Sequence, residues 1–391
     1  MKYWRGYITA ALFAALTWGL TEFAKAHGAL VDMIYPYVTR MIQDFLAGWT
    51  ADASFCLWQV LAVLLGLLAI SSIVLMIIFR WNFIQWTGWV LAVVSLGWCL
   101  HTGLYGLNQY ASPLAEDIRL TIDSDITTTD LINAATWYRD QANALALQVP
   151  RKSDGTLDAP TFQETAENAA DGFHHLVYVD NYPVFAGSTI PVKDLGWADM
   201  YTSMGIAGVT MPLTGEAAVN PNTHAVSLPW TICHEMAHRM CIAPERDANL
   251  AAFLACRANS DTIYQYSGYF MAFRYCYNAL ASISTSTAAN AANQIYDGIN
   301  EQLMADLKDY KAYYNTVQDA DSVDFANKVN NSYIQASGDE SGTRSYGGVT
   351  DLLVSWYLQE IYLPAHIDDK DENAFDPMDP NDVFIVGTTE C

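Results

Sequence analysis

Charged residues are scarce in this 391-residue chain, at 16% of the total, whereas 52% of the residues are hydrophobic and 13% are aromatic. Disordered and fibrous proteins are excluded, because a disordered chain needs low hydrophobicity and a high density of charge. Basic residues are scarcer still: 19 Lys and Arg face 42 Asp and Glu, which gives a net charge of −23. So acidic a chain repels phosphate backbones, and we expect no nucleic-acid partner.

The charge is divided unevenly along the chain. Residues 1–110 hold five basic and four acidic residues, so residues 111–391 carry 14 basic and 38 acidic residues, a net charge of −24. The sequence shows no internal repeat, and no long linker rich in Pro, Gly or Ser divides the second part. We therefore expect a membrane region over residues 1–110, one folded domain over 111–367 and an acidic tail over 368–391.

Long uncharged runs are confined to the first part. Residues 58–79 carry no charge, and a helix of this length, at about 1.5 Å per residue, crosses a hydrocarbon layer roughly 30 Å thick. Residues 82–107 form a second run, and the short turn between the two predicts a membrane hairpin. Residues 6–24 predict a third span; a signal peptide is the alternative, because Ala24-Lys25-Ala26 resembles a small-x-small cleavage site.

The basic residues of this region suggest its orientation. Lys2, Arg5 and Arg80 flank the expected spans on one side, which the excess of positive charge in cytoplasmic loops assigns to the cytoplasm. If the first segment is instead removed as a signal peptide, the mature chain starts outside and the hairpin returns it there. Both possibilities predict a multi-pass protein of the cell membrane whose folded domain is extracytoplasmic.

The segment 31–49, between the first two spans, is apolar at spacings of three and four residues. The side chains concerned are Met33, Ile34, Tyr37, Met41, Phe45 and Trp49. This pattern predicts an amphipathic helix along the outer membrane interface. An ordinary connecting helix packed on the folded domain is the alternative.

Cysteines are few, and their arrangement predicts no structural framework. Five of the seven lie in the acidic part, which is an odd number, and no Cys-x-x-Cys pair occurs. Neither a disulfide framework nor a cysteine zinc site is indicated.

Helical periodicity dominates the acidic part, and the expected fold class is mainly α with a small β-sheet. Helices are predicted over residues 128–147, 227–241, 245–258, 261–283, 288–314, 322–336 and 350–362. Short strands are predicted over residues 175–179, 189–192 and 217–219.

The functional hypothesis depends on the segment His234-Glu235-Met236-Ala237-His238. Two His residues four apart lie on one face of a helix, where their imidazoles can bind one Zn²⁺. Glu235 directly follows the first ligand, which sets its carboxylate beside the metal, in reach of a proton of the zinc-bound water. Ser227 and Pro229 supply a helix start signal. The alternative is an amphipathic helix with two incidental His residues.

A zinc hydrolase needs a third protein ligand and leaves the fourth position to water. Pro244 suits the first turn of a helix, so we expect the chain to reverse over residues 241–243 and a second helix to begin near Glu245. This reversal can return Glu245 to the metal, and Asp247, on a different face, is the rival ligand. The alternative is that both acids only complement the helix dipole. Asn249 is expected to hydrogen-bond the far nitrogen of a ligating His.

The His-Glu-x-x-His helix followed by a Glu-x-x-Ala-Asn helix resembles the zincin metallopeptidases whose third ligand is a glutamate. The pair Glu245 and Asn249 is similar to their ligand Glu and the carboxylate four residues after it. Two departures stand out: the second helix of those peptidases usually follows a longer insertion, and Asn249 replaces the usual Asp. The resemblance implies a mostly helical zincin-like domain with a peptidase site.

Nearly the whole chain also resembles a bacterial membrane family of unknown function, domain of unknown function 3810. The segments that carry this resemblance are Tyr105-Gly-Leu-Asn108, Thr214-Gly-Glu-Ala-Ala-Val-Asn220, the zinc region through Tyr266-Ser-Gly-Tyr269, Val329-Asn-Asn-Ser-Tyr333 and Ser345-Tyr346-Gly347. The resemblance implies a membrane-bound protein with a peptidase-like site and no known substrate.

Further residues are given roles beside the metal. Glu216 and Asn220 belong to a segment before the metal helix, where zincins often have an edge strand that aligns a peptide substrate; a plain structural strand is the alternative. Tyr346 could donate a hydrogen bond to the oxyanion of a tetrahedral intermediate, with ordinary packing as the alternative. His224 is expected on the surface.

These observations predict a membrane-anchored zinc metallopeptidase that cleaves a peptide or protein near the membrane. Zn²⁺ is the expected cofactor, Glu235 the general base and the lipid bilayer a partner. One alternative is a non-catalytic membrane sensor or scaffold, whose zinc should be closed by four ligands. Another is a non-peptidase amidohydrolase with the same metal. Glu235 favours hydrolysis, since a structural site needs no base.

Overall fold

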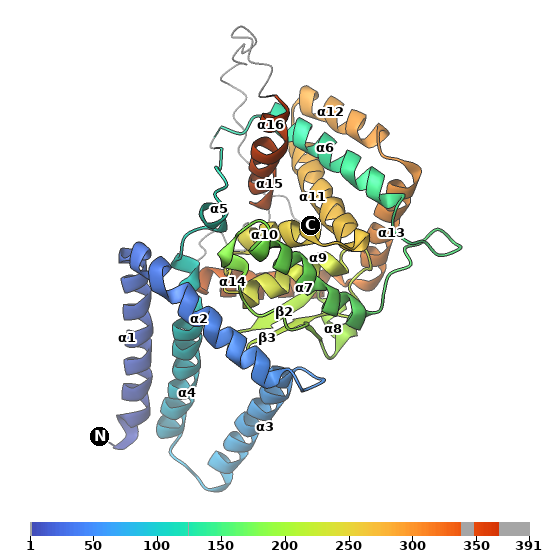
Figure 1. Ribbon diagram of the computed structural model, residues 1–391. Helices are drawn as coiled ribbons and strands as arrows, with labels where there is room; N and C mark the ends of the chain where they lie inside the picture. Colours follow the sequence, from blue (N-terminus) through green and yellow to red (C-terminus); the bar gives the residue numbers. More distant parts are fainter. Residues whose placement is uncertain (1, 124, 338–347, 367–391) are drawn as a thin grey trace.

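The computed structural model describes residues 2–123, 125–337 and 348–366, and the chain is mainly helical with one small sheet, as predicted (Figure 1). Three of its described helices are long and apolar enough to cross a membrane: α1 (Arg5–Ala26), α3 (Leu57–Ile78) and α4 (Phe83–Leu104). In Figure 1 they point away from the folded domain, and α2 (Gly28–Thr50) lies across their near ends.

Helices α1 and α4 pack side by side through small residues. A Cβ on Gly6 would come within 2.4 Å of the backbone of Gly88, so the two helices touch there. Beside this contact, Tyr7 Oη and Thr87 Oγ1 are 2.6 Å apart. Small residues of this kind are typical of helix contacts in lipid, where no hydrophobic effect drives helices together. Most of α3, by contrast, stays exposed, and it buries Gln59 alone.

The folded domain contains helices of very different length and one short sheet. Its helices are α5 (Leu114–Asp117), α6 (Thr128–Ala146), α7 (Phe162–Tyr178), α8 (Ala198–Ser203), α9 (Leu228–Arg239), α10 (Glu245–Ala258), α11 (Thr262–Ser282), α12 (Ser286–Asp297), α13 (Glu301–Val317), α14 (Ala320–Ser337), α15 (Val349–Tyr357) and α16 (Leu363–Ala365). A π-helical turn (Leu358–Tyr362) joins the last two, and short 3₁₀ turns are Lys2–Trp4, Gly106–Tyr110 and Pro183–Phe185.

The sheet has the order β1-β3-β2, so that β3 (Glu216–Val219) is central. It pairs in parallel with β1 (Lys193–Asp194) and antiparallel with β2 (Gly208–Met211), where Val209 faces Ala218. Gly215 makes the turn before β3 with a φ of +67°, and a Cβ there would lie 2.6 Å from the backbone of Ala47 on α2. Only glycine fits this turn and this contact.

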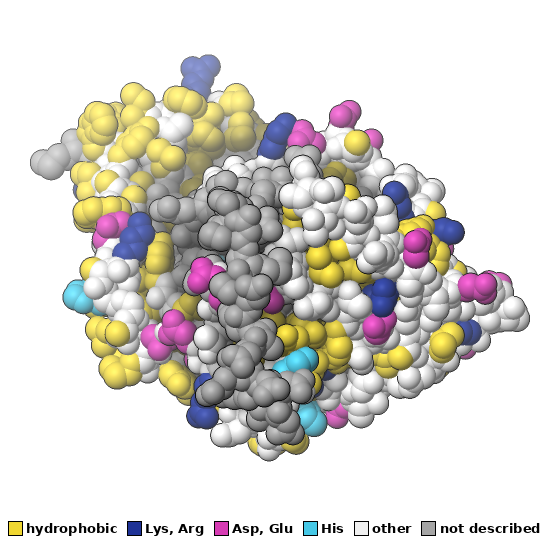
Figure 2. Space-filling view, turned by 90° about the horizontal axis from the view of Figure 1, so that it is seen from above, with side chains coloured by type: hydrophobic (Ala, Val, Ile, Leu, Met, Phe, Trp, Pro, Cys, Tyr) yellow, Lys and Arg dark blue, Asp and Glu magenta, His cyan; other side chains and the backbone are white. Residues whose placement is uncertain are grey.

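Helix α10 forms the centre of the core, with α7, α9, α11 and α15 packed around it. Residues 247–256 of α10 are all buried, which is typical of a helix surrounded by others. Gly172 lets α7 approach it, because a Cβ there would lie 2.0 Å from the Ala255 carbonyl oxygen. The outer surface differs: Figure 2 shows charged side chains interspersed over much of it, and hydrophobic ones gathered at the upper left, the side where Figure 1 places α1.

Most predicted elements occur, and three predictions need correction. Residues 175–179 are not a strand, because α7 begins with a capping box at Thr161 and its buried face continues to Leu176. Residues 189–192 form no strand, and β1 begins directly after them. The expected helix over 288–314 is two helices, since the Asn300 side chain caps a new one by accepting from Leu303 N at 2.8 Å.

Glu216 joins the sheet to the start of α3. Its carboxylate accepts from the backbone N–H groups of Leu57 at 2.7 Å and Trp58 at 2.9 Å, and it pairs with Lys193 Nζ at 2.8 Å. The Glu216 side chain is fully buried and the Lys193 side chain 11% exposed. A negative charge is favourable at a helix N-terminus, so this carboxylate stabilises both the ion pair and the first turn of α3.

Glu216→Gln is therefore expected to destabilise the chain by about 2 kcal/mol, because Lys193 keeps a buried charge without its partner. For a domain of this size such a loss lowers Tm by roughly 4–8 °C. Thermal unfolding of the purified chain in detergent measures it, with the exposed Glu167→Gln as matched control. An unchanged Tm in both variants would contradict the proposed role of the pair.

Candidate metal centre

Helix α9 begins at Leu228 with Pro229 in its first turn and ends at Arg239. The chain then reverses as expected: Cys241 has a φ of +71°, and Ile242 N donates to Ala237 O. Pro244 precedes α10, whose first residue is Glu245. This tight connection brings the first turn of α10 back against the last turns of α9.

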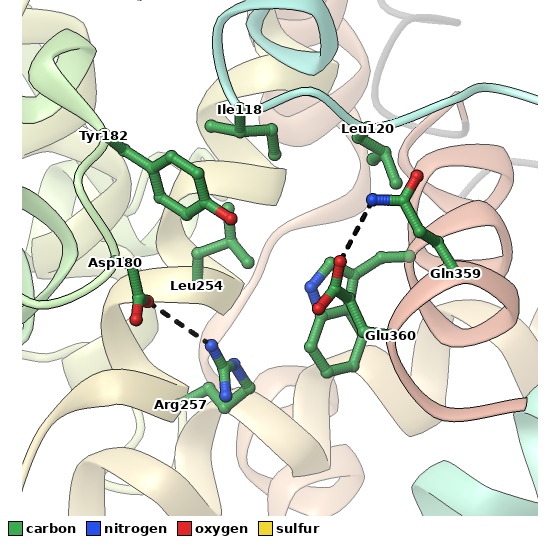
Figure 3. Close-up of a pocket in the computed structure, with 9 residues that line it drawn as sticks. Ile118, Leu120, Asp180, Tyr182, Leu254, Arg257, Gln359 and Glu360 are labelled. Atoms are coloured by element: carbon green, nitrogen blue, oxygen red, sulfur yellow. Dashed lines mark hydrogen bonds and ion pairs between the residues drawn. The ribbon is translucent and has the colours of Figure 1, made fainter. Parts of the chain in front are cut away.

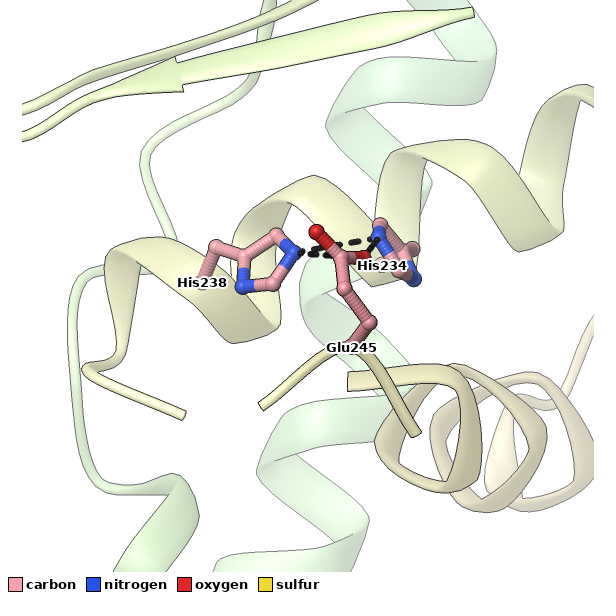
Figure 4. A group of neighbouring side chains, drawn as sticks. All are labelled: His234, His238 and Glu245. Atoms are coloured by element: carbon pink, nitrogen blue, oxygen red, sulfur yellow. Dashed lines mark hydrogen bonds and ion pairs between the residues drawn. The ribbon is translucent and has the colours of Figure 1, made fainter. Parts of the chain in front are cut away.

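Three predicted ligands, His234, His238 and Glu245, meet at this point, and we call these side chains the metal group (Figure 4). His234 Nε2 and His238 Nε2 are 3.1 Å apart, and Glu245 Oε2 lies 3.2 Å from the first and 3.4 Å from the second. In a tetrahedral Zn²⁺ site with ligands at 2.0–2.1 Å, donor atoms lie about 3.3 Å from one another. The spacing of the three atoms therefore fits a single small cation between them.

The hydrogen bonding of His238 suits a metal ligand. Its Nδ1 lies 2.9 Å from the carbonyl oxygen of Ile242. A carbonyl only accepts, so Nδ1 carries a proton, and Nε2, the nitrogen directed at His234 and Glu245, is the one that can bind a metal. This carbonyl takes the place predicted for Asn249. Within the described residues the buried Asn249 Nδ2 and His234 Nδ1 have no hydrogen-bond partner, so the predicted bond from Asn249 is not formed.

The electrostatics of the group favour positive charge between the three side chains. Burial raises the pKa of Glu245, but the two imidazoles outweigh it and hold that pKa far below its usual range. Burial alone would lower the pKa of His238, whereas the Glu245 carboxylate raises it to about 9. A carboxylate that stays ionised beside two imidazoles is a donor set suited to a divalent cation.

Glu235 lies next to this group and outside it. It is 6% exposed, and its Oε2 accepts from Thr210 Oγ1 on β2 at 2.7 Å. Gly208 on the same strand is so close that a Cβ would lie 2.5 Å from Glu235 Oε1. Burial raises the pKa of Glu235, and the neighbouring imidazoles oppose this effect. Strand β2 thus holds the carboxylate in one position beside the metal group.

The structure gives other predicted residues different surroundings. Asp247 is buried outside the metal group, and its Oδ2 accepts from Leu114 N at 3.1 Å. Glu216 is the first residue of the central strand β3 and Asn220 directly follows that strand, so neither lies on an edge strand; both are 2% exposed, and Asn220 Nδ2 donates to Thr202 Oγ1 at 2.9 Å. The prediction of an edge strand at this segment is therefore wrong.

Two more predicted residues lie apart from the metal group. His224 is half-buried, with its Nε2 3.1 Å from Asp309 Oδ2, so its expected surface position is only partly correct. Tyr346 lies outside the described residues. Sequence reasoning missed Thr210, because the strand that carries it is four residues long and has no clear strand pattern.

A pocket near the end of α10 is separate from the metal group (Figure 3). Arg257 reaches into it, with its Nη2 3.7 Å from Asp180 Oδ2 and its guanidinium over the ring of Trp356 at 5.1 Å. Arg257 follows Glu245 by twelve residues on one helix, a rise of about 18 Å. The pocket therefore lies too far away to contribute to the metal group.

One family comparison covers most of the chain. Residues 31–354 match the family described as "Protein of unknown function (DUF3810)". No curated protein and no solved structure matches the chain. Because the match spans well over half of its length, the chain belongs to the DUF3810 family.

Proposed function

We propose that this protein is a membrane-anchored, zinc-dependent metallopeptidase with a zincin-like site. The observation that carries the proposal is the group of three donor atoms within 3.4 Å of one another, with a buried carboxylate on the next residue of the same helix. His234, His238 and Glu245 would hold the metal and leave a position for water or substrate. A structural site closed by four protein ligands would need a further donor, and among the described residues the group contains three.

The chain's own residues can perform the proton transfers of peptide hydrolysis. When bound, Zn²⁺ would supply a Lewis acid that polarises the scissile carbonyl and acidifies the attacking water. The Glu235 carboxylate takes the proton of that water and then delivers it to the leaving amine nitrogen. Burial favours its protonated state between these two steps, and the hydroxyl of Thr210 keeps the carboxylate in place.

An edge strand beside the base supports a polypeptide substrate. Strand β2 pairs with β3 on one side, and no described strand pairs with its other edge. An extended peptide can add to such an edge by backbone hydrogen bonds. Because β2 also carries Thr210, a peptide bound there would lie next to Glu235. This arrangement favours peptidase activity over hydrolysis of small amides.

The membrane part supports the proposed location. The N-terminal end of α1 and the turn between α3 and α4 lie at the end remote from the folded domain (Figure 1). We assign this end, with Arg5 and Arg80, to the cytoplasm and the domain to the outer face, in keeping with the excess of positive charge on cytoplasmic segments. Packing of α1 against α4 supports a retained first span rather than a removed signal peptide.

Metal removal tests the proposal. We expect the full chain in nanodiscs to bind one Zn²⁺ and to cleave a quenched fluorogenic peptide library. Treatment with 1,10-phenanthroline should abolish cleavage, and added Zn²⁺ should restore it; the non-chelating 1,7-phenanthroline is the matched control. Zinc bound without cleavage of any probe would instead support the sensor or scaffold alternative, and a chain without zinc would contradict both.

A further inference from the structure

Helix α2 presents a stripe of large apolar side chains that cover nothing in the described structure. Its members are 49% to 72% exposed: Met33, Ile34, Tyr37, Met41, Phe45 and Trp49. Met33 and Ile34 are adjacent, and the later members follow at spacings of three and four, so all six lie on one side of the helix. A stripe of this size on the surface of a protein marks an interaction surface.

The opposite face of α2 is engaged with the folded domain. Arg40 Nε donates to Met240 O at 3.2 Å and Gln43 Nε2 to Pro212 O at 3.0 Å, and Thr39 Oγ1 donates to Asn108 Oδ1, in the 3₁₀ turn after α4, at 3.2 Å. Gln43 and Thr39 are buried by these contacts. The helix is therefore fixed by its polar face, and the apolar stripe is directed away from the domain.

The position of α2 identifies what covers the stripe. His27 alone separates α2 from α1, and α3 begins seven residues after α2 ends, so both ends of the helix adjoin helices that can cross a membrane. In Figure 1 α2 lies across the ends of all three. A bilayer that contains these helices must have its boundary at α2. We propose that the stripe lies in the interface of that bilayer, between headgroups and acyl chains, as a membrane-resting platform for the folded domain.

Large apolar side chains near the start of α3 extend this platform. Phe55, Trp197 and Met200 are about half exposed, and Phe55 and Trp197 line an apolar groove with Val60 and Val63 of α3. Tryptophan is enriched where a protein surface meets the headgroup region. The charges of α2 are Asp32, Arg40 and Asp44, so apolar burial rather than attraction to anionic lipid drives the contact.

The platform contacts the C-terminal end of the metal helix and the turn of the sheet. Arg40 holds the carbonyl of Met240, two residues after His238, and Gln43 holds the turn between β2 and β3. The metal helix and the strand that positions Glu235 thus both rest on α2. This inference does not depend on peptidase activity; where that activity holds, it confines the substrate to polypeptide segments at the membrane surface.

Depth measurements with spin labels test the platform. The full chain is reconstituted in phosphatidylcholine nanodiscs as the Cys391→Ser variant, since the other six cysteines are buried. A nitroxide is attached at Met41→Cys or Phe45→Cys; Leu147→Cys, as exposed as Phe45, is the aqueous control, and Leu65→Cys on α3 is the lipid control. We expect labels at 41 and 45 to collide with oxygen more than with a water-soluble nickel chelate, and the label at 147 to show the reverse.

Each outcome decides the proposal. A several-fold lower collision rate with the nickel chelate at 41 and 45 than at 147, unchanged when phosphatidylglycerol is added, supports an apolar platform. The proposal would be overturned if the nickel chelate reached the label at 45 as readily as the label at 147, while the label at 65 still showed a lipid environment. A protein partner would be favoured instead if labels at 41 and 45 were protected from oxygen and the nickel chelate in native membranes but were accessible to the chelate in nanodiscs. That result would also overturn the proposal. Because no cleavage is measured, failure of the platform is distinct from failure of the proposed function.

Discussion

Glu235→Gln is expected to lower the rate of peptide cleavage by about 10²- to 10⁴-fold while the chain keeps its zinc. Glutamine has the shape of glutamate, and its carbonyl oxygen can still accept from Thr210 Oγ1, so the fold around the site is preserved. It cannot take up a proton, however, and general-base catalysis contributes about 10²- to 10⁴-fold to rates of this kind. We expect kcat to fall by such a factor with one zinc per chain retained.

Zinc content by mass spectrometry and cleavage of the fluorogenic library are measured on the same samples, and the exposed Glu164→Gln serves as matched control. Cleavage that survives the change at 235 would remove the proposed base. Loss of zinc would mean that the Glu235 carboxylate holds the metal, in conflict with its place outside the group of three donors. Retained zinc with lost cleavage is the pattern of a hydrolase.

Local sequence was enough to predict the helices that build the metal group. The spacing of His234 and His238 places both imidazoles on one face, and Pro244 predicts where the next helix begins. These features depend on neighbours in the chain, so the observed meeting of both rings with Glu245 needed no knowledge of the rest of the fold. The prediction of an amphipathic helix before α3 was equally local, since its apolar period can be seen within residues 31–49 alone.

Long-range contacts could not be predicted in the same way. Glu216 was expected to bind substrate, whereas it caps α3 and pairs with Lys193, because the sheet lies against the start of a helix some 160 positions away in the chain. Thr210 reaches Glu235 only because β2 crosses α9. Strands of two to four residues carry too little pattern to reveal such neighbours. For Asn249 the helical position was predicted correctly. Its expected hydrogen bond to a histidine is not formed, because His238 Nδ1 bonds the carbonyl of Ile242 instead.

Replacement of the third ligand is expected to have the second large effect, a loss of zinc affinity. Glu245→Gln is expected to weaken zinc binding by more than about 100-fold, the upper end of what the loss of an outer hydrogen-bonding partner costs a metal site. Glutamine keeps an oxygen that can bind zinc, but it lacks the negative charge of Glu245, which the two imidazoles stabilise. Asp247→Asn, the matched control on the same helix turn, should leave zinc affinity unchanged, because Asp247 accepts from Leu114 N instead.

Competition with a chromophoric chelator measures both affinities, and the rise of Tm with added zinc gives a second readout that needs no substrate. With the wild-type chain, zinc at 100 times its Kd stabilises the folded state by about 2.7 kcal/mol, a gain that Glu245→Gln should largely lose at the same concentration. If Asp247→Asn lost the zinc and Glu245→Gln kept it, the ligand assignment would be reversed. If neither change affected binding, the cation would lie elsewhere, and the three donor atoms at the junction of α9 and α10 would be a hydrogen-bonded group in place of a metal centre.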